Sequence, residues 1–175
     1  MVDIISRAEW GARSPRAVIK ANMADASTGH WNGPTVVVAG KSKWNHSACP
    51  SLLRGIQNFH MNTRGWLDIA YNFAVCPHRK IFELRGLNVA NGANGTNSGN
   101  KSSHAILFIA GEGNEFTDEE RAAFVECVNH IAAETDAPAR AMGHRDHKST
   151  ACPGDVSYDW ISRGMPLIGS SAPAP

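Results

Sequence analysis

The most reactive side chains of this sequence gather in one turn-rich stretch, residues 143–154, which reads GHRDHKSTACPG. Imidazole nitrogens and a thiolate sulfur are donors that zinc takes, at roughly 2.0 to 2.3 Å. A loop of seven residues separates His144 from Cys152 and is long enough to fold both onto one ion. The spacing matches no standard structural zinc signature, so taken alone it favours a surface histidine and a buried, inert cysteine.

The elements that must position these side chains begin with a strand and a helix. Residues 35–39, TVVVA, form an unbroken and mostly β-branched apolar run between Gly-Pro and Gly, which is typical of a strand buried on both faces. Residues 49–64 repeat apolar side chains at helical spacing, with a proline in the first turn. The first thirty residues are interpreted as an irregular segment whose Trp10 packs on the core.

The middle of the chain predicts a hairpin, a long loop, a strand and a second helix. Residues 73–76 and 80–84 are strand-like runs on either side of a short turn. Residues 86–103 are crowded with Gly, Asn and Ser, and a loop of that length in a compact domain is usually functional. Residues 104–110 predict the last clear strand, and 117–120 form a capping box that opens an amphipathic helix.

This order of elements predicts an α/β fold with a mixed central sheet and helices on its faces. Residues 1–168 are expected to form a single domain, in which 155–163 form a short helix. Residues 169–175, rich in Ser, Ala and Pro, are expected to be a linker stub or tail.

Composition limits the classes of function. The chain has 175 residues, of which 42% are hydrophobic and 19% charged, and its net charge is +1. This balance favours a globular protein and gives no support to nucleic acid or an anionic membrane as the main partner. No apolar stretch is as long as a signal peptide or a membrane helix requires. Four cysteines in a chain that can build its own core make a disulfide framework unexpected.

Five motifs in order carry a resemblance to a known family. They read SRAEWGAR, RGIQNFHM, WLDIAYNF, ELRGLNV and GHRD followed by ACPG. Together they resemble the zinc-dependent N-acetylmuramoyl-L-alanine amidase family, which includes peptidoglycan recognition proteins and phage endolysins. The resemblance runs from about Ser6 to Ile161, and the Asn-rich loop and the turn at 75–78 most resemble endolysins of phages that infect actinobacteria.

The resemblance implies a zinc ion held by two histidines and a cysteine, with water in the open fourth position. His144 and Cys152 match the second histidine and the cysteine. Tyr71 matches a tyrosine whose hydroxyl contacts that water or the developing oxyanion. Thr150 matches a position held by Thr or Lys, and we expect it to stabilise the tetrahedral intermediate, since a threonine hydroxyl is no useful base at neutral pH.

The family's first zinc histidine is expected at the end of the first central strand, where this chain has Ala39. A methyl group cannot coordinate zinc, so two of three protein ligands would remain. Three explanations are open: Ala39 was engineered to silence a hydrolase, the protein is a natural pseudo-enzyme, or His46 or His147 supplies the missing ligand. The third is the weakest, because a catalytic metal needs ligands fixed by rigid elements.

Further candidates would contact the substrate. Aromatic faces and amide donors suit a glycan and its stem peptide, which makes Trp66, Arg85, Asn88 and Asn94 candidates for lining a groove. Two other histidines are expected to have no role in chemistry: His60 packed on its helix and His78 solvated in the hairpin turn.

The resemblance implies hydrolysis of the amide between N-acetylmuramic acid and the L-alanine of the stem peptide. The alternative is a non-catalytic pseudo-amidase that binds peptidoglycan. The expected setting is a monomeric phage lysin, made in the cytoplasm without a signal peptide and acting on the bacterial cell wall after release.

Overall fold

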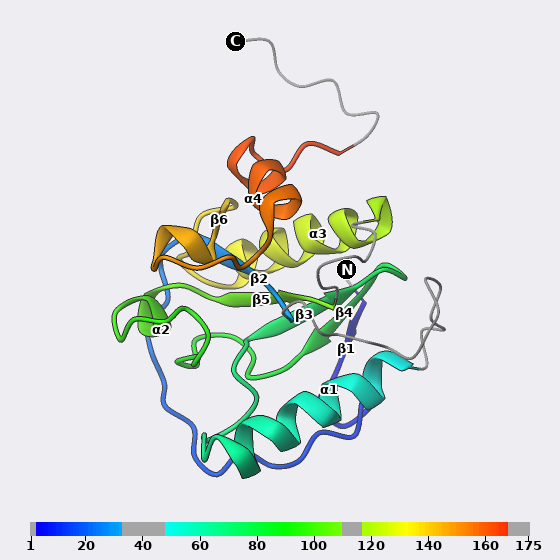
Figure 1. The fold of residues 1–175 in the computed structure, drawn as a ribbon, viewed down its shortest axis with the longest axis vertical. Coiled ribbons are helices and arrows are strands. Elements are labelled where there is room, and N and C mark those ends of the chain that lie inside the picture. The colour runs from blue at the N-terminus through cyan, green and yellow to red at the C-terminus, as the bar shows by residue number, and fades with distance from the viewer. Residues whose placement is uncertain (1–2, 33–47, 110–116, 168–175) are drawn as a thin grey trace.

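The computed structural model describes residues 3–32, 48–109 and 117–167. Within these ranges six strands form one mixed sheet, in the order β1-β4-β3-β5-β2-β6 (Figure 1). The β3–β4 pair is antiparallel and the other neighbours run parallel. The strands are β1 (Ile4–Ile5), β2 (Ser27–Trp31), β3 (Phe73–Cys76), β4 (Lys80–Glu83), β5 (Ala105–Phe108) and β6 (Ala141–Gly143).

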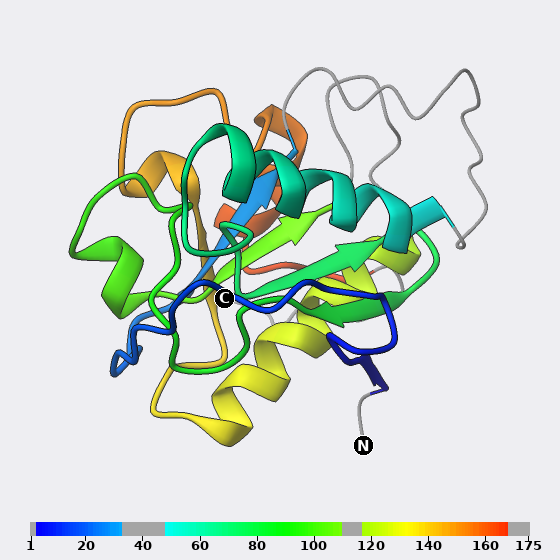
Figure 2. The same ribbon diagram turned by 90° about the horizontal axis from the view of Figure 1, so that it is seen from below.

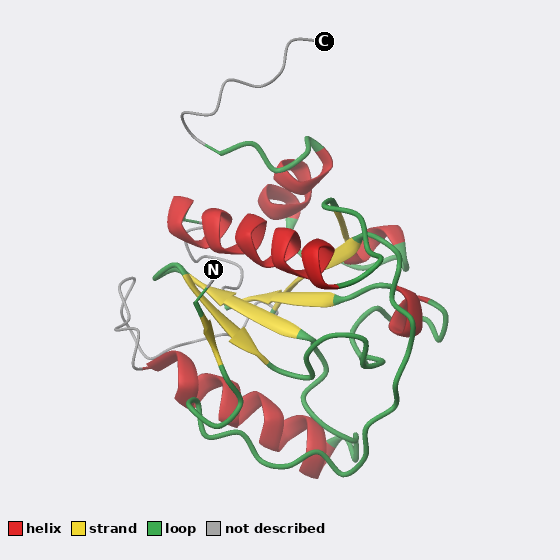
Figure 3. Cartoon of the chain, turned by 180° about the vertical axis from the view of Figure 1, so that it is seen from behind, coloured by secondary structure: helices red, strands yellow, loops and turns green. Residues whose placement is uncertain are grey.

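Two longer helices cover the two faces of the sheet, as Figures 1 and 3 show from opposite sides. One face carries α1, which continues into a π-helical turn, η1; the other carries α3. The helices are α1 (Ala48–Asn58), η1 (Phe59–Thr63), α2 (Gly99–Ser102), α3 (Asp118–Glu134), the 3-10 turn η2 (His144–Asp146) and α4 (Asp155–Ser162). None of the described helices has the length and apolar character needed to span a bilayer.

Successive side chains of each strand point to opposite faces of the sheet, so the core has two layers. On β3, Phe73 and Val75 pack with the apolar face of α3, including Phe124 and Val128. The intervening side chains point to the other face, where Cys76 packs with the α1 layer. Strands buried on both faces suit a sheet that is sandwiched between helices.

The parallel pair β2–β6 sets the position of the reactive groups. Its register places Gly29 opposite Gly143. Since the strands run parallel, the residues that follow these glycines, His30 and His144, leave the pair at the same end. A Cβ on Gly29 would lie 2.6 Å from the Ile161 side chain, so the glycine allows α4 to pack closely here.

The structure confirms several predicted elements. The helix expected at 49–64 corresponds to α1 and η1, and the hairpin at 73–84 to β3 and β4. The strand expected at 104–110 is β5, and the helices expected after Thr117 and at 155–163 are α3 and α4. The mixed sheet between helices is the predicted fold class.

Other expectations are wrong or fall outside the described residues. The first thirty residues are not irregular throughout, because β2 is a central strand and β1 an edge strand. The capping box is half formed: Thr117 Oγ1 accepts the Glu120 N–H at 3.1 Å, but the Glu120 carboxylate is buried without a hydrogen-bond partner. The expected strand at 35–39 and the tail at 169–175 lie outside the described ranges.

Candidate metal centre

Three side chains from distant parts of the chain meet at the carboxyl ends of β2 and β6. Donor atoms of His30, His144 and Cys152 all lie within 4.8 Å of one another. The two imidazole ring centroids are 4.5 Å apart. His30 is the penultimate residue of β2, and His144 directly follows β6, so the strand pairing brings the two rings together.

A hydrogen-bond chain fixes the tautomer of His30. Its Nε2 lies 2.8 Å from Asn94 Oδ1, while the Asn94 amide nitrogen donates to the carbonyls of Gly99 and Ser103. Because Asn94 presents its oxygen to the ring, His30 Nε2 carries the hydrogen and Nδ1 keeps its lone pair. Nδ1 lies 3.7 Å from Cys152 Sγ, so the lone pair is directed towards the cluster. Second-shell acceptors of this kind orient metal-binding histidines.

The position of His144 is fixed by hydrogen bonds of the 143–146 turn and not by hydrogen bonds to its ring. The backbone N–H of Gly143 donates to Asp146 Oδ2 at 2.8 Å, and the Tyr158 hydroxyl donates to the other oxygen of that carboxylate at 2.8 Å. Both ring nitrogens of His144 are buried without a hydrogen bond of normal geometry. Buried polar atoms are rarely left unpaired, so we expect a partner such as a metal ion at this ring.

Cys152 lies between two groups that orient its thiol. The Trp31 backbone N–H points at Sγ over 3.4 Å, and the Cys152 N–H donates to Thr150 Oγ1 at 3.2 Å. Burial raises the pKa of the thiol to about 11, which the Trp31 N–H and Arg145 only partly offset. A bound cation would reverse this preference and favour the thiolate.

The residues of the cluster fit a zinc ion. Burial, and next the neighbouring His144, lowers the pKa of His30 to about 3, so its ring is neutral at physiological pH. Burial, followed by His147 and Lys148, also lowers the pKa of His144. Imidazole nitrogen and cysteine sulfur are both donors that zinc accepts, and three protein ligands are the number that catalytic zinc sites use.

His30 supplies a second imidazole, so the described residues bring together two histidines and a cysteine without a contribution from position 39. Ala39 and His46 lie outside the described residues. His147 is no substitute ligand: its Nε2 lies 2.8 Å from the Thr28 hydroxyl of β2. His144 and Cys152, the two ligands that the sequence predicted, both belong to this cluster.

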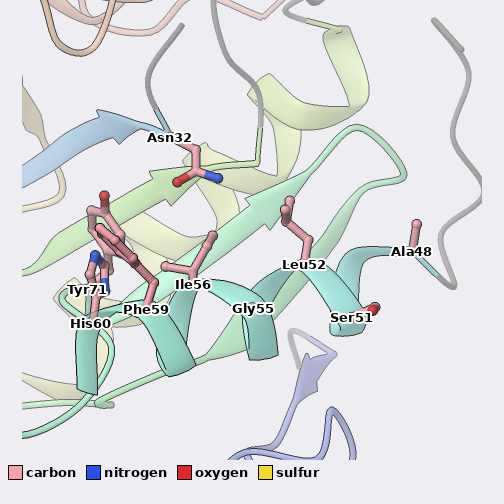
Figure 4. A pocket seen from close by; sticks show the side chains of 9 residues that line it. All are labelled: Asn32, Ala48, Ser51, Leu52, Gly55, Ile56, Phe59, His60 and Tyr71. Carbon is pink, nitrogen blue, oxygen red and sulfur yellow. The ribbon is translucent and has the colours of Figure 1, made fainter. Parts of the chain in front are cut away.

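A cavity of about 650 Å³ lies on the α1 side of the sheet, and its described lining includes Tyr71 (Figure 4). Tyr71 and His60 lie at one end of its described lining and Ala48 at the other. The Tyr71 ring centroid is 5.5 Å from that of His30, which places the phenol beside the cluster. Burial, and to a smaller extent Cys152, raises the pKa of Tyr71, so its hydroxyl keeps its proton.

A second cavity of about 620 Å³ includes Trp66, Arg85 and Gly95 in its lining. A Cβ on Gly95 would lie 3.1 Å from His144 Nε2, so this cavity also borders the cluster. Trp66 packs against His60 with ring centroids 4.8 Å apart, which links the walls of the two cavities. Arg85 donates to the carbonyls of Ile69 and Ala90, both at 2.6 Å, so its guanidinium is anchored to the backbone.

Asn88 and Asn94 do not have the expected groove positions. Asn94 is fully buried behind His30 and holds that ring instead of a substrate. Asn88 adopts a left-handed conformation with φ 52°, and its side-chain oxygen accepts the Met23 N–H. Neither asparagine belongs to the lining of the two cavities.

Sequence reasoning missed His30 because its strand has no apolar run. The β2 sequence is STGHW, and its burial comes from small and polar residues that pair with strands on both sides. The available signal was a histidine two residues before the sequence Asn-Gly-Pro at 32–34, ahead of the predicted helix. Turn residues there mark the end of a strand, which is where a ligand would be presented.

Comparisons with known proteins identify relatives of this chain and structures that share its fold. No protein-family profile matches the chain. The chain is 34% identical over 170 residues to peptidoglycan-recognition protein SC2 of Drosophila melanogaster, covering 91% of this chain and 85% of that protein. A Drosophila PGRP-LB variant in complex with tracheal cytotoxin superposes with a TM-score of 0.79 at 25% identity, covering 91% of this chain and 92% of the other. Peptidoglycan recognition protein-LE, in complex with the same ligand, described as monomeric diaminopimelic acid-type peptidoglycan, has a TM-score of 0.76 at 25% identity, with 91% and 92% covered.

Proposed function

Because the chain belongs to the peptidoglycan-recognition protein family, we propose that it is a zinc-dependent N-acetylmuramoyl-L-alanine amidase. It would hydrolyse the amide that joins N-acetylmuramic acid to the L-alanine of the stem peptide in peptidoglycan. The observation that carries this proposal is the cluster of His30, His144 and Cys152 beside the Tyr71 phenol in a cavity.

The chain's own groups suit amide hydrolysis. His30 Nδ1, a ring nitrogen of His144 and Cys152 Sγ would hold zinc, which when bound supplies Lewis-acid polarisation of the carbonyl and a water of lowered pKa. The Tyr71 hydroxyl, protonated at neutral pH, would donate a hydrogen bond to the carbonyl oxygen as negative charge develops on it. Thr150 Oγ1 accepts the Cys152 N–H, which leaves its own hydrogen to donate towards the same oxygen.

The two cavities suit an extended substrate. Both border the metal cluster, one past Tyr71 and the other past Gly95. A scissile bond at the cluster would therefore have room for a chain on each side, with the glycan in one cavity and the stem peptide in the other. Two solved relatives bind tracheal cytotoxin, a peptidoglycan fragment, which supports the same substrate class for this chain.

The test combines metal content with bond cleavage. Purified protein should contain zinc by elemental analysis and release new N-terminal alanine from purified cell wall. His30→Ala should lose zinc at this centre and all cleavage, and His147→Ala, whose ring faces Thr28, should retain both. Cleavage that survives in the His30→Ala protein would contradict the assignment of the centre.

Binding without cleavage is the competing function. If the protein sediments with cell wall but releases no alanine when loaded with zinc, it is a peptidoglycan-binding pseudo-amidase and the proposed reaction is wrong.

We further propose that the setting is that of a monomeric phage endolysin that reaches the wall of its host from the cytoplasm. The Asn-rich loop and the turn at 75–78, which resemble endolysins of actinobacterial phages, support this setting. Protein expressed inside an actinobacterial host should lyse the cells only after the membrane is permeabilised. Release of alanine without lysis under those conditions would argue against a lytic role.

A further inference from the structure

A second group of soft ligands lies at the far end of β3. Ligand atoms of Cys49, Cys76 and His78 all lie within 4.8 Å of one another. They come from the first turn of α1, the last residue of β3 and the turn that follows it. His78 Nδ1 faces Cys49 Sγ at 3.8 Å. The His78 ring is therefore directed at a thiol rather than solvated as the sequence suggested.

Both thiols of this cluster are shielded from solvent. Cys49 and Cys76 have no exposed surface, and their side chains interact with each other through a hydrogen bond. This hydrogen bond and burial are the main reasons that the pKa of Cys49 is raised. Neither residue belongs to the metal centre described above, which uses Cys152.

An independent observation points to a cation at this place. Glu120, in the first turn of α3, has no exposed surface, and neither of its carboxylate oxygens has a hydrogen-bond partner. Its charge interacts electrostatically with the thiols of Cys49 and Cys76, so it lies in the neighbourhood of this cluster, although it does not belong to the group of three donor atoms. A buried carboxyl group without a partner is costly, and a cation nearby would remove the cost. Because the Glu120 carboxylate makes no hydrogen bond to the start of α3, the predicted capping box is only half formed.

Tetrahedral zinc geometry is within reach of these side chains. Zinc–sulfur bonds of roughly 2.3 Å place two tetrahedral thiolates about 3.8 Å apart. The donor atoms of Cys49, Cys76 and His78, all within 4.8 Å of one another, would need to move by no more than about 1 Å to reach that spacing. The Glu120 carboxylate lies outside this group and would have to move towards it to complete the site. Sulfur, sulfur, imidazole and carboxylate are all ligands that zinc accepts.

We propose that Cys49, Cys76 and His78 form a second metal site, structural in role, that binds zinc with the Glu120 carboxylate as its fourth donor. The site would join the start of α1 to the β3–β4 turn and the start of α3, three segments that approach one another only in the folded chain. A Cys49–Cys76 disulfide would also use both thiols, but it would give the inward-facing Glu120 carboxylate no counter-charge.

The test removes the first centre and asks whether metal remains. The full-length Cys152→Ser variant, purified under reducing conditions, should retain one tightly bound zinc per chain. Loaded with Co²⁺ instead, it should show a thiolate-to-cobalt charge-transfer band from Cys49 and Cys76, since the other remaining cysteine, Cys127, is buried in the other core layer. This readout does not depend on amidase activity, so the second site can fail or succeed separately from the proposed reaction.

Matched variants in the Cys152→Ser background locate the ligands. Cys49→Ser or Cys76→Ser should abolish the band, whereas Cys127→Ser, a buried cysteine of the other core layer, should leave it unchanged. His78→Gln, in the half-exposed turn, and Glu120→Gln keep both thiols and should each weaken zinc binding at least tenfold. These two variants keep the test decisive if the cysteine variants fail to fold.

Two outcomes would overturn the proposal. One is a Cys152→Ser protein that is folded and reduced but binds neither zinc nor Co²⁺. The other is a protein purified without reductant in which Cys49 and Cys76 are disulfide-linked, and which binds no second metal ion after reduction.

Discussion

At the scale of single residues, the metal centre depends on a side chain that never touches the metal. Asn94 is buried, donates to two backbone carbonyls and accepts from His30 Nε2, so it fixes both the orientation of the ring and the position of its hydrogen. Such outer partners are worth roughly 10- to 100-fold in metal affinity.

Asn94→Ala should therefore weaken zinc binding at the His30 centre by about 10- to 100-fold, measured by competition with a chelator of known affinity in a Cys49→Ser background. Asn97→Ala provides the control, because Asn97 is an exposed residue of the same loop. Equal affinity in the two variants would mean that His30 is oriented by other contacts.

Tyr71 should separate binding from catalysis. Tyr71→Phe keeps the ring that packs 5.5 Å from His30 but removes the hydroxyl. We expect alanine release from cell wall to fall by about 10²- to 10³-fold, the usual cost of one oxyanion donor, with zinc content and wall binding unchanged. A loss of wall binding in proportion to activity would instead assign the hydroxyl to substrate binding.

At the scale of elements, the sequence predicts the helices and strands whose apolar side chains recur at a regular spacing. The α1 and α3 helices and the β3–β4 hairpin have apolar side chains at the spacing of their secondary structure, so the sequence predicts them. The β2 sequence, STGHW, lacks such a pattern because its strand is buried by neighbours on both sides and by α4 above Gly29. The ligand pair in the 143–154 stretch was predicted from the family resemblance, because its residue types and spacing alone favoured a surface histidine and an inert cysteine. His30 was missed along with its strand.

Gly29 is the point at which α4 packs on the sheet. A Cβ there would lie 2.6 Å from Ile161 Cδ1 and 3.2 Å from the Phe108 ring. Gly29→Ala should lower the free energy of unfolding by about 1 to 3 kcal/mol, the usual cost of overpacking, as measured by urea denaturation.

Gly55→Ala is the matched substitution on α1, where a new Cβ meets nothing within 4 Å. Since glycine is a poor residue for a helix interior, this variant should gain about 0.5 to 1 kcal/mol in the same assay. If both variants change the free energy of unfolding in the same direction, overpacking at Gly29 is not the cause of the change in Gly29→Ala.

At the scale of the whole molecule, buried neutral histidines should determine how the stability of the fold changes at acidic pH. Burial lowers the pKa of His60 and of His104 to about 4, with Arg85 and Arg64 contributing at His60 against the opposing effect of Asp68. In the unfolded chain a histidine titrates near 6.5, so the unfolded state takes up these protons first as the pH falls. Their contribution to stability is complete above about pH 6.5 and is lost as the pH falls towards about 4.

The urea midpoint of the metal-free protein should accordingly decrease between about pH 6.5 and 4. His104→Gln should make this decrease less steep, because one of the buried histidines that contribute to it no longer titrates. A midpoint that stays constant across the interval in the parent protein would exclude these histidines as the cause.

The ligands of the His30 centre also determine when metal can act during folding. His30 and Cys152 are 122 positions apart in the chain and meet only after β2 and β6 have paired. Contacts between such distant positions require loop closure before they yield any stabilisation, so we expect them to form after the rate-limiting barrier. In stopped-flow measurements on a Cys49→Ser protein, zinc should therefore slow unfolding by the full amount that it stabilises the native state and leave the rate of folding unchanged.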